Sequence, residues 1–179
     1  MIIRREAPSD YDAVHDLVKS SFATAAHGDG TEADYLRGLR KKACFIPELS
    51  LVAEDGSGAI VGQIVLSKTV IVTPHGERAE LLLSPVCVHP ACFRRGIARA
   101  LIEEGARLAG EMGFGAVFLC GDPQIYGKLG LVPTYRYNIF HGNDETKAAE
   151  WSMVRELYGS ALNGASSELG RLSTSSVSG

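Results

Sequence analysis

Residues 86–101 read VCVHPACFRRGIARAL: an apolar run, a short basic turn and the start of a helix. The first N–H groups of a helix have no internal partner, and the helix dipole places about half a positive charge there. Gly96 and Ala98 carry little side chain where the backbone would meet a ligand, and Arg94 and Arg95 add charge at the rim. The stretch therefore predicts a helix start that holds a phosphate, with a pyrophosphate as the best fit. The alternative is an ordinary surface helix that follows a glycine turn.

The helix that follows this turn is strongly patterned. Its apolar face consists of Ile97, Ala98, Leu101, Ile102, Gly105, Leu108, Ala109 and Met112. Charged residues lie opposite, and Glu103 and Arg107 have the spacing of a favourable ion pair. Gly113 is expected to end the helix in a left-handed conformation.

A second informative stretch begins at Phe114. Residues 114–120 form a short apolar run that predicts a strand, and residues 121–131 read GDPQIYGKLGL, which predicts a turn and a short helix. Taken alone, Tyr126 in this helix could simply be a half-buried aromatic residue whose hydroxyl bonds to backbone.

Together the two stretches resemble the GNAT superfamily of N-acetyltransferases. Residues 93–98 are similar to its motif A, Gln/Arg-x-x-Gly-x-Gly/Ala, and residues 126–131 are similar to its Tyr-x-x-x-Gly-Phe/Leu ending. The resemblance covers roughly residues 2–157 and is nearest to small, stand-alone predicted bacterial N-acetyltransferases. It departs at Phe93, where the family usually carries Gln or Arg, and this removes one polar contact near the phosphates.

The resemblance implies an α/β (α+β) fold with a mixed, mostly antiparallel central sheet, splayed at the cofactor site and flanked by helices. It implies acetyl-CoA as co-substrate and no metal. Pro85 cannot donate a ladder hydrogen bond and falls where the sheet should open. The cofactor-binding residues implied are Val86, Cys87 and Val88 for the pantetheine arm, Arg94, Arg95, Gly96, Ile97 and Ala98 for the pyrophosphate, and Tyr126.

The resemblance also implies catalytic roles. Tyr126 would be the general acid, because a phenol of pKa about 10 can protonate a departing thiolate whose conjugate acid has a pKa of about 8.5. Glu80 is the leading candidate for the base that deprotonates the amine, but the residue itself is better explained as a solvated glutamate on the sheet surface, and a water chain ending on backbone carbonyls would serve as the base equally well. His89 lies on the phosphate side of the turn, which favours a structural role. Cys87 lacks an evident partner that would make it a nucleophile.

Composition limits the class of protein. The chain has 179 residues, of which 45% are hydrophobic and 22% charged, and this indicates one globular domain. Its net charge is −3, so it lacks the excess of basic residues that nucleic-acid binding needs. No run has the length of a membrane span, and the four cysteines lack metal-type spacing. We expect free thiols, a cytoplasmic location and a monomer or homodimer, with the domain at residues 1–162 and a disordered tail at 163–179, rich in Ser and Gly.

The remaining elements follow from local patterns. Strands are expected at residues 2–5, 49–54, 59–72 and 79–88, with closing strands at 134–139 and 151–158, and helices at about 9–22 and 31–42. Acceptor recognition is expected from two loops that carry His27, Asp29, Asp34 and Tyr35 in the first and Tyr135 and Tyr137 in the second.

The sequence thus predicts transfer of an acetyl group from acetyl-CoA to a primary amine of a small molecule or peptide. Nothing in it names that amine. The alternative is a catalytically inactive module on the same fold that binds CoA or another protein.

Overall fold

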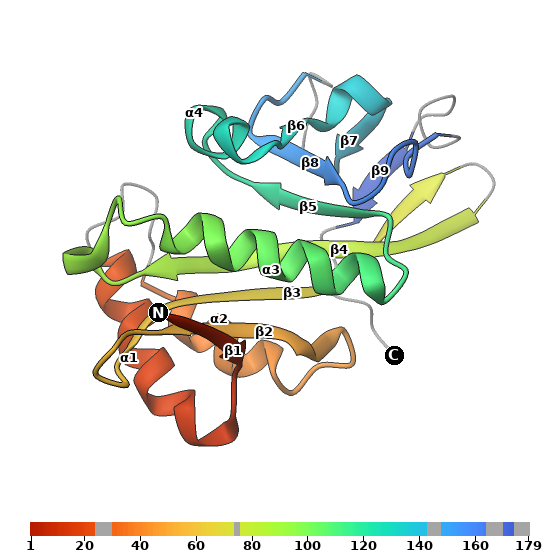
Figure 1. Cartoon of the computed structure of the whole chain (residues 1–179). Coiled ribbons are helices and arrows are strands. Elements are labelled where there is room, and N and C mark those ends of the chain that lie inside the picture. Colours follow the sequence, from red (N-terminus) through yellow and green to blue (C-terminus); the bar gives the residue numbers. More distant parts are fainter. Residues whose placement is uncertain (24–29, 74–75, 143–147, 164–169, 174–179) are drawn as a thin grey trace. The chain divides into compact units, whose positions relative to one another are not determined.

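The computed structural model describes residues 1–23, 30–73, 76–142, 148–163 and 170–173. Figure 1 shows the order of the elements along the chain. The chain forms two compact units: the first is Met1–Leu66 with Ser84–Leu108, and the second is Ser67–Leu83 with Ala109–Gly179. The elements that continue from one unit into the other are β3 (Ile60–Thr73), β4 (Gly76–Val88) and α3 (Ile97–Glu111).

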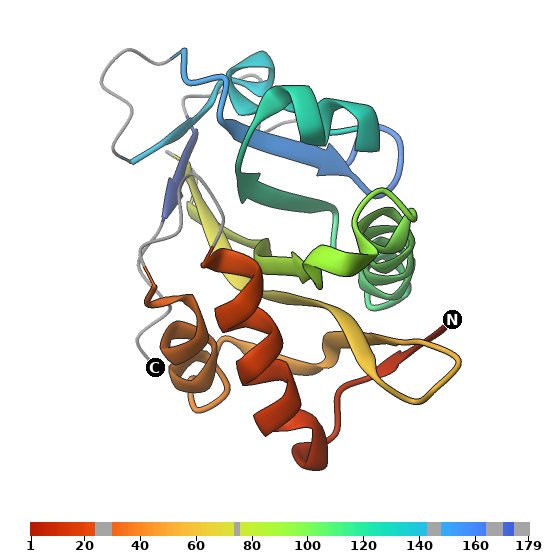
Figure 2. The ribbon, with the colours of Figure 1, turned by 90° about the vertical axis from the view of Figure 1, so that its left-hand side faces the viewer.

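In the first unit, helices cover both faces of a sheet whose strand order is β1-β2-β3-β4. β1 (Ile2–Arg5) pairs antiparallel with β2 (Phe45–Glu54). One face packs against α1 (Tyr11–Phe22) and α2 (Glu32–Leu39), whose apolar residues share a core with Val52, Val65 and Cys87. Figure 2 shows these two helices on one side of β2 and β3 and α3 on the other.

The opposite face lies close to α3, and two glycines allow this approach. A Cβ at Gly62 would lie 2.8 Å from Ile97 Cγ2, and one at Gly105 would lie 2.8 Å from Ile64 Cδ1. The buried stripe of the helix includes Ile97, Leu101 and Ile102, as its pattern predicts. Because side chains alternate along a strand, Gln63 and Val65 of β3 face α1 and α2 instead, and Val65 belongs to the core on that side.

In the second unit, the strand order is β3-β4-β5-β8-β6, and β9 (Gly170–Ser173) pairs with both β3 and β7 (Ile139–His141). β5 (Ala116–Cys120) pairs parallel with β4 and antiparallel with β8 (Ser152–Glu156), which also pairs antiparallel with β6 (Val132–Pro133). The core contains Ile71, Ala116, Phe118, Ile139, Val154 and Leu162. After β5 the chain forms α4 (Pro123–Tyr126) and the 3₁₀ turn η3 (Gly127–Leu129) (Figure 1).

Several element predictions are confirmed, including the strand at residues 2–5 and the helix that starts at Ile97 and is followed by Gly113 at φ 87°. The four cysteines are free. On α3, Arg107 forms a two-pronged interaction at 2.7 and 2.9 Å with Glu104, three residues earlier. Asp10 directly precedes α1, but its side chain makes no cap on that helix; it accepts hydrogen bonds from Arg4 and from Ala7 N instead.

The predicted strand at residues 134–139 is wrong for most of its length. Thr134–Tyr137 form a 3₁₀ helix, η4, which ends where Asn138 adopts φ 53°. The Tyr137 hydroxyl donates to Glu156 Oε2 at 3.1 Å, so a tertiary contact holds a segment that β-propensity alone assigns to a strand.

The prediction of a disordered tail is wrong for Gly170–Ser173. These residues pair with Val70–Val72 of β3 and with β7. Strand pairing uses backbone groups, which a composition rich in Ser and Gly does not reveal.

Candidate active site

The basic turn precedes α3 and has an unusual backbone. His89 begins it by accepting a hydrogen bond from Ala91 N at its own Nδ1 (3.2 Å), which is a structural role. Pro90–Cys92 form a 3₁₀ turn, η2. Arg94 and Gly96 then both have positive φ, 62° and 78°. These left-handed residues turn the chain sharply into α3, where Ala100 N donates a hydrogen bond to Gly96 O (3.0 Å).

The surface of this turn is open. Arg94, Arg95 and Gly96 are exposed, and apart from its chain neighbours no atom of the described residues lies within 4 Å of a Cβ placed at Gly96. Ala98 is half-buried, whereas the Ile97 side chain is 6% exposed and anchors the helix against Gly62. A group that binds here therefore meets the Ile97 backbone rather than its side chain. Phe93 is 52% exposed beside the turn.

The end of β4 carries the next three predicted cofactor residues. Val86 is half-buried, whereas Cys87 and Val88 are buried. The Val88 carbonyl accepts a hydrogen bond from Ser21 Oγ at 3.0 Å. Burial raises the pKa of the Cys87 thiol to about 12, so very little thiolate exists near neutral pH. This argues against Cys87 as a nucleophile.

Tyr126 lies in the second unit at the end of α4. Asp122 starts this helix by accepting a hydrogen bond from Gln124 N at 2.8 Å, and the Tyr126 ring packs on Gly121, where a Cβ would lie 2.6 Å from Tyr126 Cδ2. Burial raises the pKa of the Tyr126 hydroxyl above its usual value. The phenol therefore stays protonated at neutral pH, which is the form that an acid needs.

Glu80 is only 1% exposed, which contradicts the solvated position considered for it. Its Oε2 accepts hydrogen bonds from Gly115 N (3.0 Å) and Ala116 N (2.8 Å), and its Oε1 pairs with Arg78 Nη2 at 2.7 Å. Arg78 also donates to the Ala161 carbonyl. One carboxylate oxygen of Glu80 thus joins β4 to the start of β5, and the other holds Arg78 in place within the second unit.

The structure brings the predicted residues together in two sets. The basic turn and the end of β4 belong to the first unit, whereas Glu80 and Tyr126 belong to the second. Among the expected acceptor residues, Asp34 pairs with Arg37 on the surface and Tyr137 bonds to Glu156. His27 and Asp29 lie outside the described residues.

Sequence reasoning missed three polar residues that the structure singles out: Ser21, Gln63 and Arg78. Gln63 is fully buried, and its Nε2 has no hydrogen-bond partner among the residues that the structure describes. The signal for it was present, because a glutamine interrupts the apolar run 60–66 of a strand that is covered on both faces. Arg78 could not be paired with Glu80 from sequence alone.

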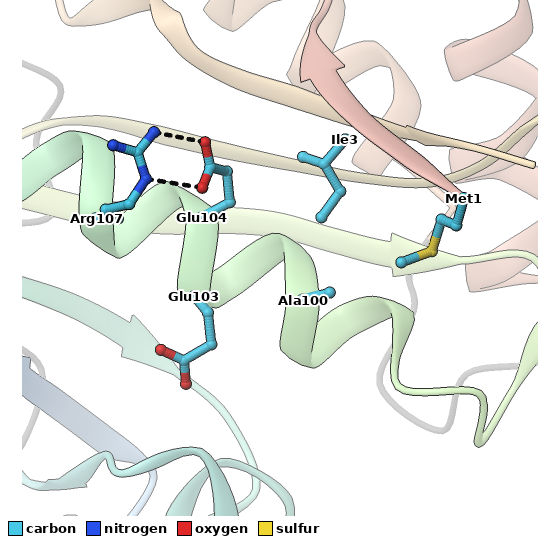
Figure 3. A pocket seen from close by; sticks show the side chains of 6 residues that line it. All are labelled: Met1, Ile3, Ala100, Glu103, Glu104 and Arg107. Atoms are coloured by element: carbon cyan, nitrogen blue, oxygen red, sulfur yellow. Dashed lines mark hydrogen bonds and ion pairs between the residues drawn. The ribbon is translucent and has the colours of Figure 1, made fainter.

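A separate pocket of about 670 Å³ lies in the first unit (Figure 3). Its lining consists of Met1, Ile3, Ala100, Glu103, Glu104 and Arg107. None of these is a predicted site residue. Within the described ranges, no group of His, Cys, Asp and Glu has an arrangement that could hold a metal ion. None of the helices there has the length and apolar character that a bilayer crossing requires.

The comparisons with known proteins agree with this fold. Residues 47–136 match the family model described as an acetyltransferase (GNAT) domain. A solved GNAT family N-acetyltransferase from Escherichia coli, YhbS in complex with CoA, is 26% identical, with a TM-score of 0.81 over 96% of this chain and 87% of that one. A GNAT family acetyltransferase from Brucella melitensis, solved with acetyl-CoA, is 30% identical, with a TM-score of 0.65 over 73% of this chain and 81% of that one. No curated protein matches at a significant level.

The fold and the family model together define an acetyltransferase. The chain belongs to the GNAT family, and its sheet, which is mostly antiparallel and flanked by helices, has the GNAT fold.

Proposed function

We propose that this protein is an N-acetyltransferase that moves the acetyl group of acetyl-CoA to a primary amine of a small molecule or peptide. The observation that carries the proposal is the basic turn, which leaves the N-terminus of the 15-residue helix α3 open behind Gly96 and flanks it with exposed Arg94 and Arg95. The two GNAT proteins of the comparison were solved with CoA and with acetyl-CoA, which supports the same co-substrate here.

The residues of the first unit fit the polar parts of that co-substrate. The N–H groups of Gly96, Ile97 and Ala98, at the start of α3, would bind the pyrophosphate, and the two arginines would balance its charge. The backbone of Val86, Cys87 and Val88 would pair with the pantetheine amides. β4 and β5 pair at Leu81↔Val117 and Leu82↔Phe118, and Pro85 follows shortly after in β4.

Tyr126 would act as the general acid. Acetyl-CoA supplies a thioester, and the attack of a neutral amine on its carbonyl carbon expels the CoA thiolate. The protonated hydroxyl of the half-buried Tyr126 can give that thiolate a proton, and the amine gives up its own proton to a base or to water. The two units would then form one domain, at residues 1–162. The family model supports this, since residues 47–136 include parts of both units.

Glu80 as that base stays a prediction. A base needs a lone pair that faces the amine, whereas the Glu80 oxygens already bind two amides and a guanidinium. This arrangement favours a positioning role at the start of β5. The rate profile of Glu80→Gln against pH decides between the roles, because loss of a base removes the acidic limb of the profile.

A specific observation supports a second candidate, an inactive module that binds CoA. Phe93 is 52% exposed at the position where the family usually places Gln or Arg, so this side of the turn offers the phosphates no polar side chain. Binding without turnover of any amine would identify this second function. A cytoplasmic location and a monomeric or homodimeric state also remain proposals, which fractionation and light scattering test.

The experiment has two parts. Acetyl-CoA at 100 times its Kd should stabilise the protein by about 2.7 kcal/mol, which a thermal shift detects. Replacing both Arg94 and Arg95 by Gln should weaken this shift, and replacing exposed Lys41 and Lys42 by Gln, the same charge change elsewhere in the first unit, should not.

A panel of amines, read by release of free CoA thiol, then tests turnover. Tyr126→Phe should lower kcat about a hundredfold or more, while Tyr158→Phe, which alters a 54% exposed tyrosine of the same unit, serves as the matched control. Equal loss in the two variants, or none in Tyr126→Phe, would remove the acid from the proposal.

A further inference from the structure

Ser21 is a polar residue in the apolar stripe of α1. The buried residues of this helix recur at the spacing of a face that packs on a sheet, and they are Val14, Leu17, Val18 and Ser21. The first three belong to the core that α1 shares with the sheet, whereas Ser21, 9% exposed, contacts the end of β4. A serine at such a position loses apolar burial, and its hydroxyl needs a hydrogen-bond partner.

The Ser21 hydroxyl binds the last peptide of β4. Its Oγ donates to the Val88 carbonyl at 3.0 Å, and both residues are buried. On the other side of the same peptide, His89 N donates to Val61 O of β3 at 2.9 Å. Because the C=O and N–H of a trans peptide point in opposite directions, the Val88 carbonyl points away from β3, where Ser21 binds it. This peptide is thus held on one side by the sheet and on the other by α1.

The same peptide lies between the two parts of the proposed co-substrate site in the first unit. The backbone of residues 86–88 is proposed to pair with the pantetheine amides, and residues 94–98 to bind the pyrophosphate. After His89 the chain forms the 3₁₀ turn η2, so the strand pairing that orients the earlier peptides ends here. Within a strand, the N–H and C=O of one residue point to the same edge, so the Val88 N–H also points away from β3. By binding the Val88 carbonyl, Ser21 fixes the direction of this N–H.

We propose that Ser21 is a positioning residue for the pantetheine arm, whose hydroxyl holds Val88 so that the Val88 N–H points at an amide oxygen of that arm. Ser21 acts through Val88 and does not itself touch the co-substrate. The inference rests on the proposed function, because it takes β4 as the strand that binds pantetheine. Loss of the hydroxyl should therefore weaken a ligand that carries the arm and spare one that carries only the nucleotide. A serine that merely satisfies a buried carbonyl would affect folding stability alone.

Two ligands separate these roles. CoA carries the pantetheine arm, whereas 3′-phospho-ADP is its nucleotide with the pyrophosphate and without that arm. Calorimetric titration gives the Kd of each for wild type, for Ser21→Ala and for the control Ser20→Ala, because exposed Ser20 donates only within its own helix, to Leu17 O at 2.9 Å. We expect Ser21→Ala to raise the Kd of CoA about three- to tenfold, the effect of one hydrogen bond, and to change that of 3′-phospho-ADP less than about twofold. Ser20→Ala should change neither.

A second pair of variants makes the test independent of packing at this buried position. Ser21→Thr and Ser21→Val introduce side chains of the same shape, of which only threonine has a hydroxyl. The Kd of CoA should be about three- to tenfold higher for Ser21→Val than for Ser21→Thr, with equal Kd values for 3′-phospho-ADP.

Three outcomes overturn the inference alone: Ser21→Ala binds CoA like Ser20→Ala, both ligands weaken to the same extent, or the Thr and Val variants bind CoA equally. Failure of the proposed function is distinct, because wild type itself would then bind no CoA, and the inference would be refuted with it.

Discussion

Replacement of Glu80 should destabilise the second unit far more than a change at an ordinary glutamate. Its carboxylate is 1% exposed and serves three donors: Gly115 N, Ala116 N and Arg78. Glu80→Ala leaves two buried amides and a guanidinium without their acceptor, and breaking a buried ion pair in this way costs about 3–5 kcal/mol. Because the Arg78 side chain is 34% exposed and can bind water, we expect the lower end, about 3 kcal/mol.

The variant Glu80→Gln separates the contribution of the two amide hydrogen bonds from that of the ion pair with Arg78. The glutamine carbonyl can still accept from the two amides, but its NH₂ group replaces the acceptor that faces Arg78, so we expect a loss of about 1–2 kcal/mol. Urea unfolding measures both variants. A protein of this size loses about 2–4 °C in midpoint per kcal/mol, so heating should lower the Glu80→Ala midpoint by about 6–12 °C.

Glu77→Ala is the matched control, because Glu77 lies on the same strand and is exposed. It should change the unfolding free energy by less than about 0.5 kcal/mol. If Glu80→Ala were as stable as Glu77→Ala, the reasoning from its three hydrogen-bonded donors would be refuted.

Three further predictions follow from the packing and charges. Gly105→Ala should destabilise by about 1–3 kcal/mol, because its Cβ would lie 2.8 Å from Ile64 Cδ1 and 2.9 Å from Leu66 Cδ1, whereas Gly38→Ala in α2 meets no atom within 4 Å and should be neutral or stabilising in urea unfolding. The Arg4 guanidinium lowers the pKa of Asp10 below its ordinary 3.8, so its contribution to stability is present above that value and is lost as the pH falls through the lower folded-state pKa. Asp10→Asn should therefore be less stable at pH 7 and show a smaller loss of stability in acid, and an equal acid loss in both proteins would contradict this assignment. Cys87, with a pKa of about 12, should react with iodoacetamide at pH 8 far more slowly than exposed Cys120 in the folded protein, and peptide mass spectrometry that finds equal rates would show that Cys87 is not held as described.

Local sequence patterns predict most of the helices and strands. An element that buries one face carries apolar residues at a regular spacing, and that spacing is visible in the sequence. The periodicity after Gly96 predicts α3, and glycines and charged residues mark the ends of the strands. The basic turn is also predictable, since the need for positive φ at Gly96 follows from its residue type. Arg94 at φ 62° is not predictable, because an arginine has no such preference and the surrounding turn imposes it.

The errors arise where distant contacts decide the structure. Nothing in the local sequence sets Glu80 apart from other glutamates. Its structural role follows from the hydrogen bond that its carboxylate accepts from Gly115 N, a residue distant in the sequence, and from its ion pair with Arg78. The 3₁₀ helix at Thr134–Tyr137 is held by the hydrogen bond between Tyr137 and Glu156. β9 forms because its backbone pairs with β3 and β7, which lie far from it in the sequence. The complete burial of Gln63 can be predicted only once both faces of β3 are known to be covered.

At Arg94, folding stability competes with the ligand binding that we propose for this position. A left-handed backbone costs a residue with a Cβ about 1–2 kcal/mol, a cost that glycine largely avoids. The residue that would make this turn most stable is therefore not the one that would best attract an anion to it. Selection for heat resistance alone would replace the arginine, whereas selection at low co-substrate concentration would keep it, so the amino acid at position 94 reflects which of the two demands is stronger.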